Sequence, residues 1–294
     1  MPVAELEVLA VGPQALVEDL GRPGVAHLGV PASGAADRAS LAQGNRLLGN
    51  PSGAAGIEVL LGGFACRADS PVLLALTGAP VAATLDDEPA PFGTPFAVRR
   101  GQRLTLSIPE HGMRTYLCVR GGLGGTRHFG SVAADPTSGL GTPPLAPGDR
   151  LPIGTASDEP TAGLAVAGVD TAGAPIEVRA TWGPRQDRLT GRAARQLAEG
   201  VWTVSPQLDR VGIRLDGATL SLRSDEQLSS EGVVRGAVQV PPSGAPVIFL
   251  ADHPTTGGYP VVAVVADRDT DRLAQLRPGD RLRLRLRPVS WSTD

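Results

Sequence analysis

Two short apolar runs in the last fifth of the chain place the strongest constraint on its fold. Val247–Ala251 and Val261–Val265 are apolar at every position and too short for typical helices, which is the pattern of strands buried on both faces. Asp252–Pro260 lies between them and carries a carboxylate, an imidazole, three hydroxyls and two glycines that free the backbone for positive φ. We therefore expect a polar loop held by two core strands, either as a functional site or as a turn that closes a hairpin.

Composition favours a mainly β protein with more than one domain. The 294 residues include 38 Gly and 27 Pro but only 3% aromatic residues, which is typical of many tight turns joined by strands of Val, Leu and Ala. The length exceeds that of one typical domain.

Charge and residue usage exclude several functions. No lysine occurs in the chain, so it holds no Walker A lysine, no pyridoxal Schiff base and no covalent biotin. A net charge of −3 argues against nucleic acid as a partner. The two cysteines match no disulfide framework or metal-ligand spacing, and no signal sequence or apolar run of about 20 residues is present. We expect a cytoplasmic, non-membrane protein without a metal site.

A quasi-repeated phrase predicts two β-rich halves of similar plan. VRRGQRLTL from Val98, LAPGDRLPI from Leu145 and LRPGDRLRL from Leu276 each place a glycine turn before an apolar strand. The expected domains are residues 1–153 and 175–290, joined by a linker over 154–174 that is rich in Ala, Gly, Asp, Pro and Thr.

The first half offers an anion site where a glycine-rich loop enters a predicted helix at Ala35–Leu48. The alternative to an anion site is that Ser33 caps this helix, Asp37 interacts favourably with the helix dipole and Arg38 is a solvated charge. Four polar residues surround the point where the helix begins: His27, Ser33, Asp37 and Arg38.

Two further charged residues follow or interrupt strands in this half. Arg120 follows a predicted strand and either binds a carboxylate or forms a surface ion pair. Glu58 interrupts the apolar run Ile57–Leu61, and strand alternation favours an outward-facing side chain there.

Six phrases, in this order along the chain, resemble the allophanate hydrolase subunit 2-like family, which includes the biotin-dependent carboxyltransferase region of urea carboxylase, the C subunit of 5-oxoprolinase and a sporulation-kinase regulatory subunit. They are GRPGVAHLGVPASGAADRASLAQGNRLLGNP, YLCVRGGL, WGPRQDRL, SPQLDRVGIRLDG, SEGVVRGAVQVPPSG and LADHPTTGGYPVVAVV.

This resemblance implies two cyclophilin-like β-barrel domains with a few short helices. It implies a subunit of an ATP-dependent 5-oxoprolinase, which hydrolyses the small cyclic amide 5-oxo-L-proline to L-glutamate together with a subunit 1-like protein and a LamB/YcsF-like protein. ATP is the cofactor that the resemblance implies, on this chain or on a partner. The alternatives are a carboxyltransferase component of a urea-type carboxylase and a non-catalytic regulatory partner of a kinase inhibitor.

The resemblance also marks candidate residues, whose roles we predict from their chemistry. We expect Arg120 or Arg38 to hold a carboxylate, the Gly257 and Gly258 amides with two threonines to hold an oxyanion or phosphate, and His253 or Asp252 to move a proton. The catalytic candidates are Asp252, His253, Thr255, Thr256 and Tyr259, and the substrate-binding candidates are Arg22, His27, Ser33, Asp37, Arg38, Arg120, Gly257 and Gly258.

The sequence departs from the family pattern at two places. Ala133 and Ala134 replace hydroxyl residues before Asp135, and Val261 stands where many relatives have lysine.

Overall fold

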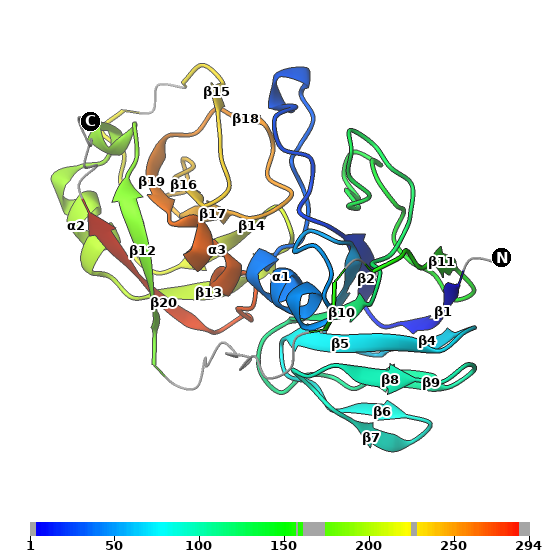
Figure 1. The fold of residues 1–294 in the computed structure, drawn as a ribbon. Helices are drawn as coiled ribbons and strands as arrows, with labels where there is room; N and C mark the ends of the chain where they lie inside the picture. The colour runs from blue at the N-terminus through cyan, green and yellow to red at the C-terminus, as the bar shows by residue number, and fades with distance from the viewer. Residues whose placement is uncertain (1–3, 157, 161–173, 225–227, 288–294) are drawn as a thin grey trace. The chain divides into compact units, whose positions relative to one another are not determined.

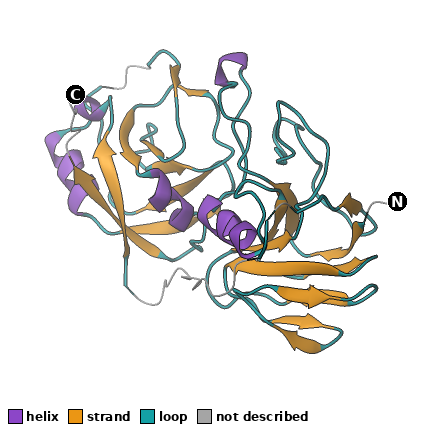
Figure 2. Cartoon of the chain, viewed as in Figure 1, coloured by secondary structure: helices purple, strands orange, loops and turns teal. Residues whose placement is uncertain are grey.

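The computed structural model describes residues 4–156, 158–160, 174–224 and 228–287, and its chain is mainly β (Figure 2). It forms two compact units, one of Met1–Val25 with Ala32–Asp170 and the other of Ala26–Pro31 with Thr171–Asp294. The predicted linker, residues 154–174, lies mostly outside the described residues.

The first unit contains two sheets that share one hydrophobic core. One sheet has the order β11-β1-β4-β9-β6-β7 and the other has the order β2-β3-β10-β5-β8. Their strands are β1 (Glu5–Val11), β2 (Gln14–Glu18), β3 (Gly56–Leu60), β4 (Phe64–Ala68), β5 (Val72–Gly78), β6 (Ala83–Leu85), β7 (Glu88–Ala90), β8 (Phe96–Val98), β9 (Arg103–Leu106), β10 (Arg114–Val119) and β11 (Arg150–Pro152).

Helix α1 (Arg38–Leu47) packs on β5 and β10 through a small apolar cluster that includes Leu41 and Tyr116. Its N-cap is Asp37, whose Oδ1 accepts a hydrogen bond from the Ser40 amide at 3.0 Å. The helix therefore begins three residues later than predicted, because Asp37 rather than Ser33 caps it.

The second unit is built on a closed barrel of seven strands (Figure 1). Its order is β12-β19-β16-β17-β14-β13-β20, and the ring closes where β12 pairs with β20 in parallel. Their bounds are β12 (Ile176–Trp182), β13 (Trp202–Leu208), β14 (Gly212–Asp216), β16 (Ala237–Gln239), β17 (Val247–Phe249), β19 (Val261–Val265) and β20 (Arg281–Arg287). Inward-facing Val, Ile and Leu side chains fill the barrel around Trp202.

Short elements complete the second unit. The second unit also has the pair β15 (Glu231–Gly232) and β18 (Thr256–Gly257), and the helices α2 (Gly191–Glu199) and α3 (Asp267–Leu273). The 3-10 turns are η1 (Ala26–Leu28) and η2 (Gln186–Arg188). In the described part of the chain no helix is long and apolar enough to cross a membrane.

The predicted mainly β class is confirmed, and so are the glycine turns that the quasi-repeat places before strands. Gly101, Gly148 and Gly279 all have positive φ, and each lies two residues before the start of a strand, respectively β9, β11 and β20. In the first unit the strands form two sheets, whereas the closed barrel is in the second unit.

Candidate functional site

The outer wall of the barrel at β16, β17 and β19 is apolar, which is why the sequence shows continuous apolar runs there. Ile248 faces the barrel core, whereas Phe249 and Val261 belong to a second buried cluster on the outside. The two predicted strands do not form a hairpin, because β16 lies between β17 and β19 and pairs with both. The turn interpretation of the intervening loop is therefore wrong.

A register shift between β16 and β19 affects the outer wall. Val238 pairs with Ala263 but Gln239 pairs with Val261, so Val262 is an extra residue in the ladder. Val238 faces the barrel core, and the next side chain, Gln239, faces the outer wall beneath the loop.

Asp252 anchors the start of this loop through a buried ion pair. Its Oδ2 accepts from Nε of Arg210 at 2.7 Å and its Oδ1 from Nη2 at 3.0 Å. The two side chains are 3% and 6% exposed. Removal of one partner would leave the other charge buried, so this two-point contact fixes where the loop leaves β17.

His253 is buried against Phe249, with ring centroids 6.1 Å apart and an interplanar angle of 28°. Its Nδ1 lies 2.7 Å from the carbonyl oxygen of Pro254. Because a carbonyl oxygen only accepts, Nδ1 carries the proton in this contact. The imidazole thereby supports Phe249, which lines the pocket described below.

The two threonines form a short β segment above the wall. Thr255 accepts a backbone hydrogen bond from Val233, and Thr256 pairs with Gly232 in the β15–β18 ladder. Glu231 in β15 forms a two-point ion pair with Arg185, whose hydrogen bond holds the pKa of this carboxyl below its usual value. The ladder holds the loop over the outer wall.

Gly257 is required by close approach rather than by its φ. A Cβ at this residue would lie 2.7 Å from Nε2 of Gln239, which donates to the backbone oxygen of Tyr259 at 2.9 Å. Neither Gly257 nor Gly258 has a positive φ, so our expectation about their backbone freedom is wrong. Gly258 is less confined, because a Cβ added there would have no heavy atom nearer than 3.7 Å.

A pocket of about 630 Å³ lies between this loop and the outer wall of the barrel. Its lining is mostly apolar, with a guanidinium, a carboxamide and two hydroxyls at its margin, as is usual for small-molecule sites. The residues that line it are Arg214, Gln239, Pro241, Pro242, Ser243, Val247, Phe249, Pro254, Gly257, Gly258 and Tyr259.

The structure brings part of the predicted set to this pocket. Tyr259, Gly257 and Gly258 line it, whereas Asp252 and His253 lie behind its wall. Sequence reasoning missed Arg214, Gln239 and Ser243. The strict alternation of Ile213, Arg214 and Leu215 could have indicated that Arg214 faces outward, but not which strand lies beside it.

The backbone amides at the start of helix α1 are already hydrogen-bonded to other side chains of the protein. The Ala36 amide donates to Glu58 at 2.9 Å, and the Asp37 amide donates to the Tyr116 hydroxyl at 2.8 Å. The Ser40 hydroxyl also donates to Asp37, at 2.6 Å. These amides are already used in holding the helix to its sheet.

Glu58 is buried, which corrects the outward orientation that we expected from strand alternation. Its carboxylate accepts from Tyr116 at 2.7 Å and from Nε of Arg114 at 3.2 Å. Burial, reinforced by the charge of Glu58, raises the pKa of Tyr116 well above its usual value. The group is a fully buried polar network beneath α1.

The remaining candidates of the first half are dispersed. Arg120 donates to the Leu48 carbonyl oxygen at 2.9 Å and so caps the C-terminal end of α1. Arg22 is 1% exposed and donates to the Ala133 carbonyl oxygen. Ser33 is buried with a φ of 49°, whereas Arg38 is partly exposed.

His27 is exposed in η1, within the segment that groups with the second unit. Among the described residues, no group of three or more His, Cys, Asp or Glu side chains could hold a metal ion.

Comparison with known proteins settles the family. Residues 28–286 match the model of the carboxyltransferase domain, subdomains A and B. The chain belongs to this family. It is 35% identical to the C subunit of 5-oxoprolinase from Escherichia coli, over 93% of this chain and 88% of that protein. It is 34% identical to the protein of the same name from Haemophilus influenzae, over 95% and 90%.

The fold is also that of a larger enzyme. The crystal structure of the Kluyveromyces lactis urea amidolyase superposes with a TM-score of 0.90 and 27% identity, over 99% of this chain. This chain spans 19% of that protein. The resemblance to carboxyltransferase domains that the sequence phrases suggest is therefore confirmed.

Proposed function

We propose that this chain is the C subunit of an ATP-dependent 5-oxoprolinase, which hydrolyses 5-oxo-L-proline to L-glutamate with subunit 1-like and LamB/YcsF-like partners. The observation that carries the proposal is similarity to two proteins named as C subunits of 5-oxoprolinase, over about nine-tenths of both sequences. A shared fold alone would not support an activity, but similarity over about nine-tenths of both sequences supports a shared role.

The pocket beneath the loop suits such a substrate. 5-Oxo-L-proline is a small ring with one carboxylate and one lactam, and the pocket combines an apolar wall with a few polar groups. We assign Arg214 to the carboxylate, because a guanidinium binds it through two hydrogen bonds. Tyr259 and Ser243 supply hydroxyl donors for the lactam oxygen.

Ring opening adds water across the lactam C–N bond, and its coupling to ATP hydrolysis makes the reaction favourable. The carbonyl oxygen gains negative charge when the carbon is attacked, so donors placed around it stabilise the transition state. In this proposal Asp252 and His253 position the loop and Phe249, and Thr255 and Thr256 hold it through the β15–β18 ladder.

The test is glutamate release from 5-oxoproline and ATP by the complete set of three proteins, with each protein omitted in turn. We expect turnover only with all three. Arg214→Gln should raise KM by at least about tenfold, since it removes a charge-assisted contact. Arg192→Gln is the matched control, because Arg192 is an exposed arginine on α2 outside the pocket.

Turnover without this chain, or equal KM values for Arg214→Gln and Arg192→Gln, would contradict the proposal. A second candidate is a biotin-dependent carboxyltransferase component, favoured by the close superposition on urea amidolyase. Carboxyl transfer from a biotinylated partner, without glutamate release, would support that candidate instead.

A further inference from the structure

The last strand of the barrel has an unusual outer face. β20 reads RLRLRLR, and its leucines point into the barrel core while its arginines point outward. Arginines at edge strands prevent aggregation, but β20 is not an edge, because it pairs with β12 on one side and β13 on the other. Protection of an edge therefore does not explain this row of charges.

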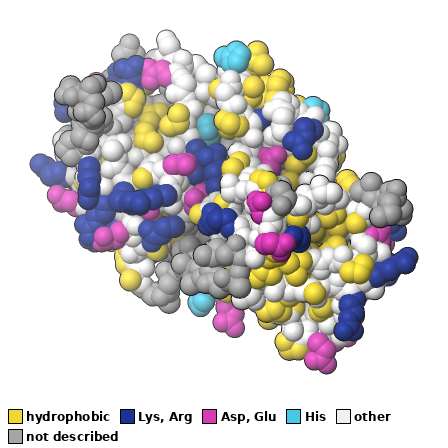
Figure 3. Space-filling view, viewed as in Figure 1, with side chains coloured by type: hydrophobic (Ala, Val, Ile, Leu, Met, Phe, Trp, Pro, Cys, Tyr) yellow, Lys and Arg dark blue, Asp and Glu magenta, His cyan; other side chains and the backbone are white. Residues whose placement is uncertain are grey.

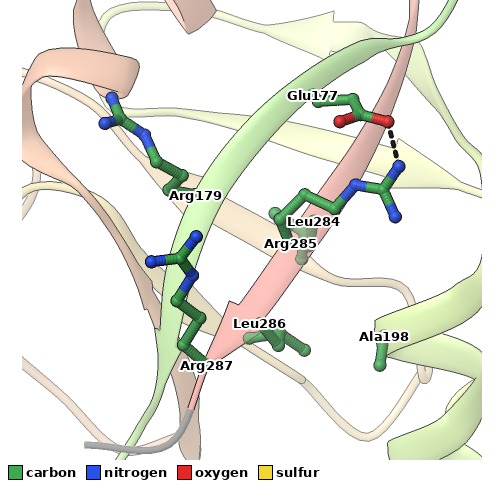
Figure 4. Close-up of a pocket in the computed structure, with 7 residues that line it drawn as sticks. All are labelled: Glu177, Arg179, Ala198, Leu284, Arg285, Leu286 and Arg287. Atoms are coloured by element: carbon green, nitrogen blue, oxygen red, sulfur yellow. Dashed lines mark hydrogen bonds and ion pairs between the residues drawn. The ribbon is translucent and has the colours of Figure 1, made fainter. Parts of the chain in front are cut away.

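The end of this row, Arg285 and Arg287, forms one wall of a pocket of about 620 Å³. In the parallel ladder Arg179 lies directly opposite Arg285, so these two arginines are on neighbouring strands and on the same outer face. Ala198 of α2 completes the lining with Glu177, Leu284, Leu286 and Arg287 (Figure 4).

Two of the three arginines that line the pocket already have carboxylate partners. Arg179 donates to both oxygens of Asp269, at 2.7 and 2.8 Å, and Arg285 is paired with Glu177. Figure 4 shows Arg285 turned toward Glu177, whereas Arg287 extends from the end of β20 on the other side. Within the described residues Arg287 has no acidic partner, so the pocket keeps excess positive charge.

The surroundings add to this charge. Arg281 and Arg283 lie on the same outer face of β20, and Figure 3 shows basic side chains gathered where Figure 1 draws β12 and β20. The chain has no lysine, so each of these charges is a planar guanidinium. Guanidinium groups match the oxygens of phosphoryl groups through paired hydrogen bonds.

This pocket is separate from the one assigned to 5-oxoproline. In the ring of seven strands β12 and β20 are neighbours, whereas β14, β17 and β16 form the opposite wall. No residue lines both pockets.

We propose that the arginine pocket of β12, β20 and α2 binds a phosphoryl-bearing anion. Arg287 makes the primary contact, and Arg179 and Arg285 orient oxygens of the ligand while they remain held by Asp269 and Glu177. The pocket is concave and fixed on two paired strands, so it suits a compact group with several charged oxygens better than a long flexible chain.

The test is isothermal titration of the full chain with pyrophosphate, inorganic phosphate, ATP and adenosine at constant ionic strength. We expect pyrophosphate to bind and adenosine not to bind. Arg287→Gln should weaken pyrophosphate binding by about tenfold or more, and Arg192→Gln should leave it unchanged. The second variant loses the same charge from α2 but lies outside the pocket.

Comparison of the four ligands in this titration also shows which kind of molecule carries the phosphoryl group. Binding of ATP tighter than that of pyrophosphate would indicate a nucleotide, and equal binding would indicate that the phosphoryl groups alone are recognised. The proposal is wrong if pyrophosphate does not bind, if the two variants bind equally, or if a glutamate-rich peptide binds as tightly as pyrophosphate and loses the same affinity in Arg287→Gln. Glutamate release does not enter this test, so its outcome is independent of the 5-oxoprolinase proposal.

Discussion

At the scale of single residues, Gly257 and Gly258 show that a glycine can be required for lack of space rather than for its backbone conformation. Both have ordinary φ, so alanine is compatible with the backbone at either position. They differ in what surrounds them, because only Gly257 lies against the side chain of Gln239.

We predict that Gly257→Ala disrupts the pocket and that Gly258→Ala does not. The new methyl group at 257 would lie 2.7 Å from Nε2 of Gln239 and would displace the side chain that holds the Tyr259 backbone. Glutamate formation by the complete set of proteins should fall at least about tenfold in kcat/KM, as expected when a site is misplaced by a fraction of an ångström.

Gly258→Ala is the matched control for this change. Its Cβ would have no neighbour nearer than 3.7 Å, so activity and melting temperature should stay close to those of the unchanged protein. Similar losses in both variants would show that the loop is sensitive to any side chain, and would remove the role given to Gln239.

Among the elements, the β-strands were easier to predict than helix α3. β3, β17 and β19 begin and end within two residues of the predicted apolar runs, because continuous apolar residues define them. α3 was missed because its sequence DRDTDRL has no apolar face. Its Asp269 and Asp271 are buried and form ion pairs with Arg179 and Arg235, which lie far away in the sequence.

The same limit applies to the candidate site. The loop at Asp252–Pro260 was found from its flanking strands and its functional groups, and the structure places part of it over a pocket. Arg214 could not be found in this way, because local periodicity gives the face of a strand but not its neighbours. The partners of Glu58 depend on long-range pairing of β3, β10 and α1 in the same way.

Helix α1 provides a prediction at this scale. Asp37→Ala removes the N-cap contact to Ser40 and should lower the free energy of unfolding of the first unit by about 1 kcal/mol. Asp37→Asn keeps an acceptor and should cost much less. Unfolding in urea measures both changes when alkylation of Cys66 and Cys118, which are buried in the folded chain, is used as the probe.

This pair of variants also examines the substrate-binding role predicted for Asp37. If Asp37→Asn is stable but inactive in the three-protein assay, the carboxylate has a function beyond capping. If Asp37→Ala and Asp37→Asn lower the free energy of unfolding equally, the N-cap hydrogen bond is not what the Asp37 side chain contributes to stability.

At the scale of the whole molecule, the cysteines and tryptophans that can report unfolding lie in different units. Both cysteines lie in the first unit, whereas Trp182 and Trp202 lie in the second. Burial raises the pKa of Cys66 and Cys118 from 9.0 to about 12. Between these values the unfolded chain loses thiol protons that the folded chain keeps, so stability is complete below pH 9 and falls as pH rises.

We predict that a change from pH 8 to pH 10 destabilises the first unit selectively, by about 1.4 kcal/mol for each thiol. In urea, a short pulse of iodoacetamide counted by intact mass should show an earlier midpoint at pH 10. Tryptophan fluorescence, which reports the second unit, should shift less. Cys66→Ala should halve the shift, and coincident midpoints for both probes would show that the units unfold together.

The parallel pairing of β12 with β20 governs how the second unit can be made. β12 is the first strand of its barrel and β20 is the last, so the barrel cannot close until residue 287 has left the ribosome. The two-sheet unit, whose last strand ends at Pro152, has all its strands available much earlier. During synthesis the first unit can therefore fold while the barrel strands are still unpaired. This interval is when the nascent protein most needs a chaperone.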